Sequence, residues 1–128
     1  MIALACDHSG VELKEEMKKL LDSMGLTYKD FGTNETVSCD YPIYGYRAAK
    51  AVASGECDRG ILICGTGVGI GIAASKVKGT RVCTCSDVYS AELSKRHNNS
   101  NIHLNHFVFF CCNCMNYGCN HFYIGYID

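Results

Sequence analysis

The sequence predicts an α/β domain, a three-layer sandwich whose central layer is a parallel sheet of about five strands. Short apolar runs alternate with segments of helical hydrophobic spacing through the first hundred residues. Repeated units of this kind build parallel sheets with right-handed crossovers. The chain has 128 residues, a length that suits one domain.

The first half of this pattern is strand, helix, strand. Residues 2–5 are an apolar run that ends in polar residues, as a strand end does. Residues 11–24 carry apolar side chains at helical spacing between Lys and Glu, and Gly25 ends the predicted helix. Residues 27–31 are the second expected strand, closed by Gly32.

The second half continues the alternation. Residues 44–54 are Ala-rich and predict a helix, whereas residues 60–64 form a continuous apolar run. Such a run is typical of a central parallel strand that is buried on both faces. A helix of small residues is expected over 68–76, followed by a strand over 81–85 and a helix over 88–97.

Composition and charge exclude several classes of protein. Hydrophobic residues make up 48% of the chain and charged residues 20%, which indicates a packed domain rather than a disordered one. The net charge of -1, without a Lys/Arg run, predicts no binding to nucleic acid or to a membrane surface. No apolar run is long enough to span a bilayer. Because the N-terminus has no cationic lead and meets Asp7 early, we expect no secretory signal and a cytoplasmic protein.

The ten cysteines are expected to be mostly reduced thiols, since no secretory signal accompanies them. Several lie within apolar runs, where a thiol acts as a small apolar side chain. Five are expected to fill the core or to be bystanders: Cys6, Cys39, Cys57, Cys83 and Cys85.

Chemistry is expected where the strands end, because open parallel sheets bind ligands beyond the carboxyl ends of their strands. Three polar or glycine-rich loops follow predicted strands, and we expect them to converge on one crevice. They contain residues 7–10, 64–69 and 86–87.

The segment Gly-Thr-Gly-Val-Gly-Ile-Gly over residues 65–71 is the sharpest local feature. Its glycines would let backbone N–H groups cradle an oxyanion or a phosphate at a helix N-terminus; a turn shaped only for tight packing is the alternative. The pattern is not the dinucleotide fingerprint, and it lacks the Lys of a P-loop. Cys64 precedes it and is either a base or nucleophile facing these amides or a small apolar plug.

Two histidines are further candidates. His8 follows Asp7, and the two form either a capping or solvated pair or a substrate contact. His97 ends a predicted helix, where a histidine often only complements the helix dipole. The Asp-Phe-Gly tripeptide at 30–32 matches a kinase motif by chance, because no other kinase signature is present.

The order of the motifs resembles one family. The chain contains Cys-Asp-His-Ser-Gly, Asp-Phe-Gly-Thr, Asp-Tyr-Pro, Gly-Glu-Cys-Asp-Arg-Gly-Ile-Leu-Ile-Cys-Gly-Thr-Gly-Val-Gly-Ile, Ala-Ala-Ser-Lys and Ala-Glu-Leu-Ser-Lys-Arg-His-Asn in that order. This series closely resembles ribose-5-phosphate isomerase B, of the family that also includes the galactose-6-phosphate isomerase subunits. The resemblance covers roughly residues 1–102.

The resemblance implies a flavodoxin-like, Rossmann-like fold and an isomerase that uses no metal and no other cofactor. Its reaction would interconvert ribose 5-phosphate and ribulose 5-phosphate through a cis-enediolate, with Cys64 as the base. Backbone amides around the glycine segment would stabilise the enediolate oxygen more than the ground state. These amides belong to Gly65, Gly67, Val68 and Gly69.

The same resemblance assigns the remaining site residues. Thr66 and His97 would help to open the furanose ring, and Asp7 would order the sugar hydroxyls. His8 would bind the phosphate and Asn98 would hydrogen-bond the substrate. In the family the site lies between two subunits, which implies a homodimer or tetramer. Galactose 6-phosphate and allose 6-phosphate remain alternative substrates.

The resemblance ends near residue 102, which divides the chain into an isomerase domain, 1–102, and an atypical Cys-, Asn- and Phe-rich tail, 103–128. The family continues with phosphate-binding arginines and helices, whereas no arginine follows Arg96 in this chain. A frameshift would explain the tail, because its residue types have A/T-rich codons. A genuine specialised tail is the alternative.

Three hypotheses of function follow. The first is the isomerase, with turnover that the altered tail could impair. The second is a sugar-phosphate-binding or anion-binding domain without turnover. The third is an interaction module stabilised by zinc, although the spacing fits no standard finger. Its candidate ligands are His103, His106, Cys111, Cys112, Cys114, Cys119 and His121.

Overall fold

A computed structural model describes residues 1–106, with backbone alone for residues 105 and 106. The strands are β1 (Ile2–Cys6), β2 (Tyr28–Asp30), β3 (Arg59–Cys64), β4 (Val82–Thr84) and β5 (Ile102–His106). The helices are α1 (Val11–Ser23), α2 (Tyr41–Ala53), α3 (Val68–Ser75) and α4 (Val88–Asn98), and a short 3-10 turn, η1 (His8–Gly10), precedes α1.

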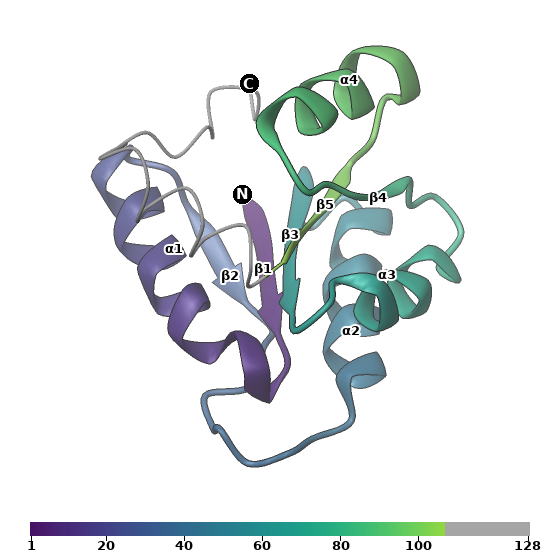
Figure 1. Cartoon of the computed structure of the whole chain (residues 1–128). Coiled ribbons are helices and arrows are strands. Elements are labelled where there is room, and N and C mark those ends of the chain that lie inside the picture. Colours follow the sequence, from purple (N-terminus) through teal and green to yellow (C-terminus); the bar gives the residue numbers. More distant parts are fainter. Residues whose placement is uncertain (107–128) are drawn as a thin grey trace.

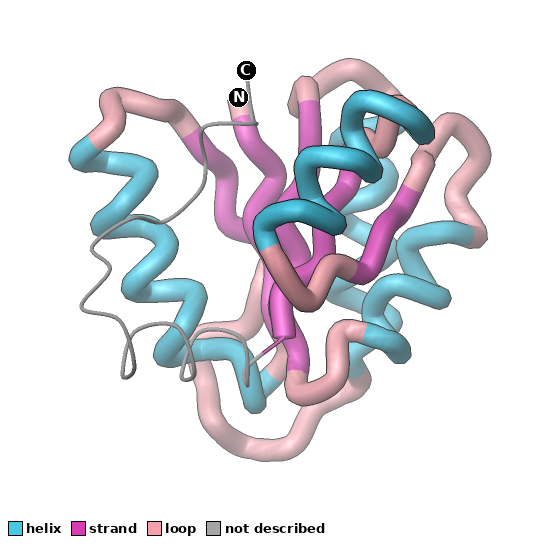
Figure 2. The backbone as a smooth tube through the Cα atoms, turned by 45° about the horizontal axis from the view of Figure 1, so that its top comes forward, coloured by secondary structure: helices cyan, strands magenta, loops and turns pink. Residues whose placement is uncertain are grey.

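The five strands form one sheet in the order β2-β1-β3-β5-β4, and every neighbouring pair is parallel. Helix α1 covers one face of this sheet, and α2 and α3 cover the other (Figure 1). The tube in Figure 2 shows the same layering, with the strands between the helices. The predicted α/β sandwich with a parallel sheet of about five strands is therefore confirmed.

The side chains of β1 show how the strand sequence builds both cores. Ala3 and Ala5 face α2 and α3, whereas Ile2, Leu4 and Cys6 face α1, because successive side chains of a strand point to opposite faces. The small residues on the first face leave room for α2 and α3 to pack closely against the sheet. The larger residues on the second face fill the space under α1.

The largest boundary difference is at α2, which begins three residues before the expected position 44. Pro42 lies in its first turn, where a proline is preorganised for the helix and no backbone N–H is needed. The close contact of α2 with α3 depends on Gly45. A Cβ there would lie 2.8 Å from the backbone oxygen of Ile70, so only glycine fits.

Lys14 is fully buried, and its charge is satisfied within the protein. Its ammonium group lies 2.8 Å from the Asp30 carboxylate and donates to the Thr33 carbonyl and the Asn34 side-chain oxygen, each at 2.7 Å. A buried charge requires such partners. Asp30 also accepts from the Gly32 N–H at 2.8 Å. The Asp-Phe-Gly tripeptide thus has a structural role, and Lys14 anchors the loop that leads from β2 towards α2.

No helix within residues 1–106 is long and apolar enough to cross a membrane.

Most of the atypical tail, from residue 107 on, lies outside the described residues, and so do the zinc candidates Cys111, Cys112, Cys114, Cys119 and His121. Among the described residues, no cluster of three or more His, Cys, Asp or Glu side chains is arranged for a metal ion. The His103 ring instead lies 3.5 Å from the Ser100 hydroxyl.

Candidate active site

The loops after β1 and β3 meet at the carboxyl edge of the sheet. The Asp7 N–H donates to the Ile63 carbonyl at 3.3 Å. A Cβ on Gly65 would lie 3.4 Å from the Ser9 hydroxyl, so the two loops are in contact. The predicted convergence on one crevice is therefore confirmed for two of the three loops. The third loop is separated from β3 by β5, and its Asp87 caps α4 by accepting from the Ser90 N–H at 2.7 Å.

Cys64 is the last residue of β3, and its side chain is buried. The Gly67 N–H, at the N-cap of α3, donates to the Cys64 sulfur at 3.1 Å. Gly67 has φ 74°, a left-handed conformation that disfavours any residue with a Cβ. The sharp turn therefore aims a helix N-terminal amide at the thiol. The geometry orients the sulfur and complements negative charge on it.

The glycines of residues 65–71 do not all serve the same purpose. Some are required by tight packing, and others shape the turn beside Cys64. A Cβ on Gly69 would lie 2.8 Å from the Tyr41 ring, and one on Gly71 would lie 2.5 Å from Leu104. These two positions are therefore required by packing. Gly65 is exposed, and Gly67 provides the left-handed turn at the sulfur. Within the segment, Gly65, Thr66 and Val68 are exposed, whereas Gly67 is buried.

Thr66 and Val68 lie at the exposed rim of the turn. The Thr66 hydroxyl accepts from the Val68 N–H at 3.2 Å, and both side chains are exposed. Thr66 therefore presents its hydroxyl beside the Cys64 turn, within the same short loop. The structure brings these two predicted site residues together with Gly65 and Gly67.

Asp7 is buried. One of its carboxylate oxygens caps the η1 turn, and the other is open to a ligand. Its Oδ1 accepts from the Ser9 N–H at 2.9 Å and from the Ser9 hydroxyl at 2.6 Å. Its Oδ2 makes no hydrogen bond within the described part of the chain. The capping interpretation therefore accounts for one carboxylate oxygen, and the second is available to a ligand.

His8 lies against the loop between β2 and α2. Its Nδ1 accepts from the Cys39 N–H at 3.4 Å, and the Cys39 sulfur lies 3.8 Å away. Cys39 was expected to be a core filler or a bystander, but it is only half-buried and contacts a candidate site residue. No local pattern could have found this contact, because the two residues are 31 positions apart.

His97 and Asn98 lie at the opposite edge of the sheet. Helix α4 starts after the carboxyl end of β4 and must finish before β5 begins, where Ile102 pairs with Gly60 of β3. Cys64 is four residues farther along β3, which is about 13 Å at the rise of a strand. Within one chain, His97 and Asn98 therefore do not join the Cys64 loop. Figure 1 shows α4 near the top, away from the starts of α1 and α3.

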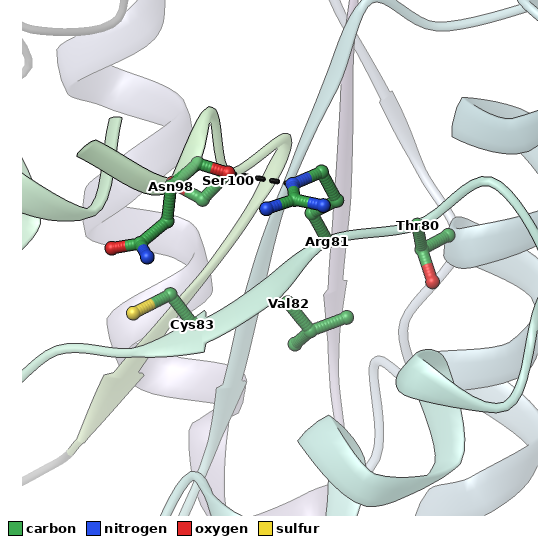
Figure 3. A pocket seen from close by; sticks show the side chains of 6 residues that line it. All are labelled: Thr80, Arg81, Val82, Cys83, Asn98 and Ser100. Atoms are coloured by element: carbon green, nitrogen blue, oxygen red, sulfur yellow. Dashed lines mark hydrogen bonds between the residues drawn. The ribbon is translucent and has the colours of Figure 1, made fainter. Parts of the chain in front are cut away.

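A hollow of 460 Å³ lies at that opposite edge (Figure 3). The Arg81 Nε donates to the Asn98 carbonyl at 2.6 Å, and the Ser94 and Ser100 hydroxyls are 2.9 Å apart. These contacts hold the end of α4 in place. The hollow is lined by Thr80, Arg81, Val82, Cys83, Asn98 and Ser100.

Burial makes other cysteines poor candidates for the base. It raises the pKa of the Cys6 thiol to about 12 and that of the Cys85 thiol to about 11, so both stay protonated at neutral pH. Cys57 is buried as well. The expected core role is confirmed for Cys6, Cys57 and Cys85, whereas Cys83 is half-buried and lines the hollow.

The family model described as Ribose/Galactose Isomerase matches residues 2–104. The chain belongs to this family. Ribose/galactose isomerases act on sugar phosphates, so this chain is a sugar-phosphate isomerase by family.

Individual members of the ribose/galactose isomerase family agree with this assignment. Ribose-5-phosphate isomerase B of Escherichia coli is 52% identical over 101 residues, which are 79% of this chain and 68% of that protein. Galactose-6-phosphate isomerase subunit LacB of Clostridium acetobutylicum is 44% identical over 102 residues, 80% of this chain and 59% of LacB. The crystal structure of ribose-5-phosphate isomerase B from Mycoplasma genitalium with bound ribulose-5-phosphate matches with a TM-score of 0.76 and 36% identity. The match covers 81% of this chain and 70% of that chain.

Proposed function

We propose that this chain interconverts ribose 5-phosphate and ribulose 5-phosphate, with Cys64 as the base. The observation that carries the proposal is the hydrogen bond from the Gly67 N–H to the Cys64 sulfur at the start of α3. The identity of 52% to the Escherichia coli enzyme supports this choice of sugar. The ligand in the Mycoplasma genitalium structure supports it as well.

The reaction moves one proton between neighbouring carbons and needs no external oxidant. The Cys64 thiolate removes the C2 proton of the open-chain aldose, and that electron pair forms the C1–C2 double bond of a cis-enediolate. The C1 carbonyl oxygen takes up the negative charge, which backbone amides of the glycine segment other than those of Gly67 and Val68 would stabilise, because these two N–H groups already donate to the Cys64 sulfur and the Thr66 hydroxyl. The proton then returns to C1 while the hydroxyl proton passes from O2 to O1, and the ketose results.

Three side chains near this turn would bind and prepare the sugar. Asp7 offers its free Oδ2 to sugar hydroxyls, while Ser9 holds Oδ1. His8 offers a ring nitrogen to the phosphate. Thr66 presents an exposed hydroxyl beside the base for proton transfer during ring opening.

A second copy of the chain would supply His97 and Asn98. They lie at the edge of the sheet opposite Cys64, so one chain holds two halves of a site that do not meet. Helix α3 begins beside Cys64 and leads to the opposite edge, where the Asn101 side chain donates to the Gly79 carbonyl at 3.0 Å. An antiparallel pairing of α3 with its copy across a two-fold axis would therefore bring the two halves together.

The outer surface of α2 and α3 fits such a homodimer. It carries large apolar side chains that are exposed by 42% at Tyr41 and 55% at Ile72. These side chains come from two helices that pack against each other, and exposed apolar groups that gather on one surface mark an interaction site. The patch consists of Tyr41, Ile43, Tyr46, Val68 and Ile72. Ile72→Glu should convert the dimer to monomer in light scattering and abolish turnover while the circular dichroism spectrum stays unchanged.

The test of function compares the purified chain with its Cys64→Ala and Cys64→Ser variants. We expect ribulose 5-phosphate to form from ribose 5-phosphate with the unaltered chain, and kcat to fall about a thousandfold in both variants. A fold check by circular dichroism accompanies each protein. Turnover that persists in Cys64→Ala excludes Cys64 as the base. A parallel assay with galactose 6-phosphate and allose 6-phosphate decides between substrates.

A binding protein with impaired turnover is the second candidate. The observation in its favour is that no arginine follows Arg96 in the chain, because arginine is the preferred bidentate partner of a phosphate. Calorimetric titration with ribose 5-phosphate separates the two candidates. Binding without turnover in the folded dimer favours this second function.

A further inference from the structure

Among the side chains and backbone groups of residues 1–104, the imidazole of His8 has a hydrogen-bonding neighbour on only one side of its ring. The Cys39 N–H donates to Nδ1 at 3.4 Å, and the Cys39 sulfur is 3.8 Å from the same nitrogen. A ring nitrogen that accepts a hydrogen bond from an N–H carries no proton of its own. The uncharged ring must then carry its proton on Nε2.

The loop that presents Cys39 is anchored at both ends. At its start, the Thr33 N–H donates to the Cys6 carbonyl at 3.2 Å, and the Thr33 carbonyl accepts from the buried Lys14 ammonium at 2.7 Å. At its end the loop enters α2, whose Ile43 N–H donates to the Asp40 carbonyl at 3.2 Å. The Cys39 amide is therefore held in place before a ligand arrives.

The opposite ring nitrogen of His8 has no such neighbour. Nε2 makes no hydrogen bond with any side chain or backbone group of residues 1–104. It lies on the side of the ring away from Cys39, and the preceding residue, Asp7, has an Oδ2 that makes no hydrogen bond within the described residues. An Nε2–H group in this position can only donate, so it suits an oxygen ligand with negative charge.

We infer that Cys39 is a positioning residue: its backbone N–H holds His8 in the tautomer protonated on Nε2 and so makes His8 an N–H donor to an anionic ligand. The identity of the ligand as the sugar's phosphate group rests on the proposed function, whereas the tautomer does not. The thiol of Cys39 is not required for this role.

The tautomer is measured by long-range ¹H–¹⁵N correlation spectra of the ¹⁵N-labelled full chain at a pH where His8 is uncharged, with His8→Gln to assign the signals. We expect an unprotonated Nδ1, a protonated Nε2 and a scalar coupling between the Cys39 amide nitrogen and Nδ1.

Cys39→Ala keeps the amide and should leave this pattern intact. Cys39→Pro removes the N–H and should give a detectable fraction of the Nδ1-protonated form. A protonated Nδ1 in the unaltered chain, or no coupling there, overturns the inference even if the proline variant does not fold.

The consequence for ligand binding is measured with two replacements of His8. The glutamine amide can place an N–H near the position of Nε2, whereas the shorter asparagine amide reaches only the position of Nδ1. We expect KM for ribose 5-phosphate to rise about tenfold in His8→Asn and less in His8→Gln, with a smaller change in kcat. Equal KM values for both variants contradict a donor role for Nε2–H. If the chain lacks isomerase activity, the same comparison is made on the Kd for inorganic phosphate, so failure of the proposed function leaves the inference testable.

Discussion

The backbone N–H of Gly67 donates a hydrogen bond to the sulfur of Cys64 across 3.1 Å. The bond exists because Gly67 takes the left-handed conformation at the N-cap of α3, with φ 74°. A strand end, a glycine turn and a helix start are thus combined in the five residues from Cys64 to Val68. The catalytic proposal depends on this turn more than on any other local structure.

Gly67→Ala should distinguish the role of this turn in catalysis from the loss of stability that any Cβ causes at a left-handed residue. A Cβ in the left-handed region costs about 1 kcal/mol, and relief of that strain would move the amide away from Cys64. Gly55→Ala is the matched control, because Gly55 has φ 80° with nothing within 4 Å of an added Cβ. Thermal unfolding should show similar losses for both variants, but kcat should fall only in Gly67→Ala. A similar fall in kcat for both would remove the special role of the turn.

The ion pair of Lys14 and Asp30 should make stability depend on pH. Burial on its own would raise the pKa of Asp30, but hydrogen bonds from Lys14, Lys18 and the Gly32 N–H hold it below its usual value. A lowered folded-state pKa contributes stability above the unfolded-state pKa of about 3.9, and this contribution is lost as pH falls through the folded-state pKa. Urea unfolding from pH 7 to pH 2 should therefore show a fall in stability below about pH 4.

Asp30→Asn should remove much of this acid sensitivity. At pH 7 it leaves the Lys14 charge buried without its counter-ion, at a cost of about 3 kcal/mol in the free energy of unfolding. The control Glu16→Gln breaks the exposed pair with Lys19, which contributes less than about 0.5 kcal/mol. An Asp30→Asn protein with an unchanged pH profile would show that the acid transition has another origin.

Gly71→Ala should test the interpretation that the later glycines serve packing. An added Cβ would lie 2.5 Å from Leu104 Cδ1 in the core between α3 and the sheet. We expect a loss of about 2 kcal/mol in the free energy of unfolding from overpacking, in spite of the better helix propensity of alanine. Leu104→Val removes the clashing atom, so the double variant should be about 1 kcal/mol more stable than the sum of the single changes predicts. Additive effects would mean that the two sites do not touch.

The periodicity of the sequence predicted the layers and the edge of the sheet where chemistry belongs, because both follow from local spacing and from parallel topology. It placed Cys64 and Thr66 in one loop for the same reason. It could not place His97 relative to Cys64, because the direction of α4 across the sheet separates them. Nor could it pair His8 with Cys39, since that contact depends on how the long loop folds back over β1.

The separation of Cys64 from His97 leads to a prediction about mixed dimers. If each site takes Cys64 from one chain and His97 from the other, then Cys64→Ala and His97→Ala dimers are both inactive. After the two variants are mixed and their subunits exchanged, half of the dimers are mixed and each carries one intact site. Isomerase activity should therefore recover to about a quarter of that of the unaltered protein.

A second mixture supplies the control for this recovery. Cys64→Ala and Thr66→Ala change the same loop of the same chain, so every site in a mixed dimer still carries one defect. We expect no recovery from that pair under identical conditions, with subunit exchange verified by mass spectrometry of differently tagged chains. Recovery in both mixtures, or in neither, contradicts a site shared between subunits. Every chain in the first mixture lacks either Cys64 or His97, and subunit exchange cannot restore an unaltered chain. Recovery in that mixture alone therefore requires that His97 of one chain act on the Cys64 loop of its partner.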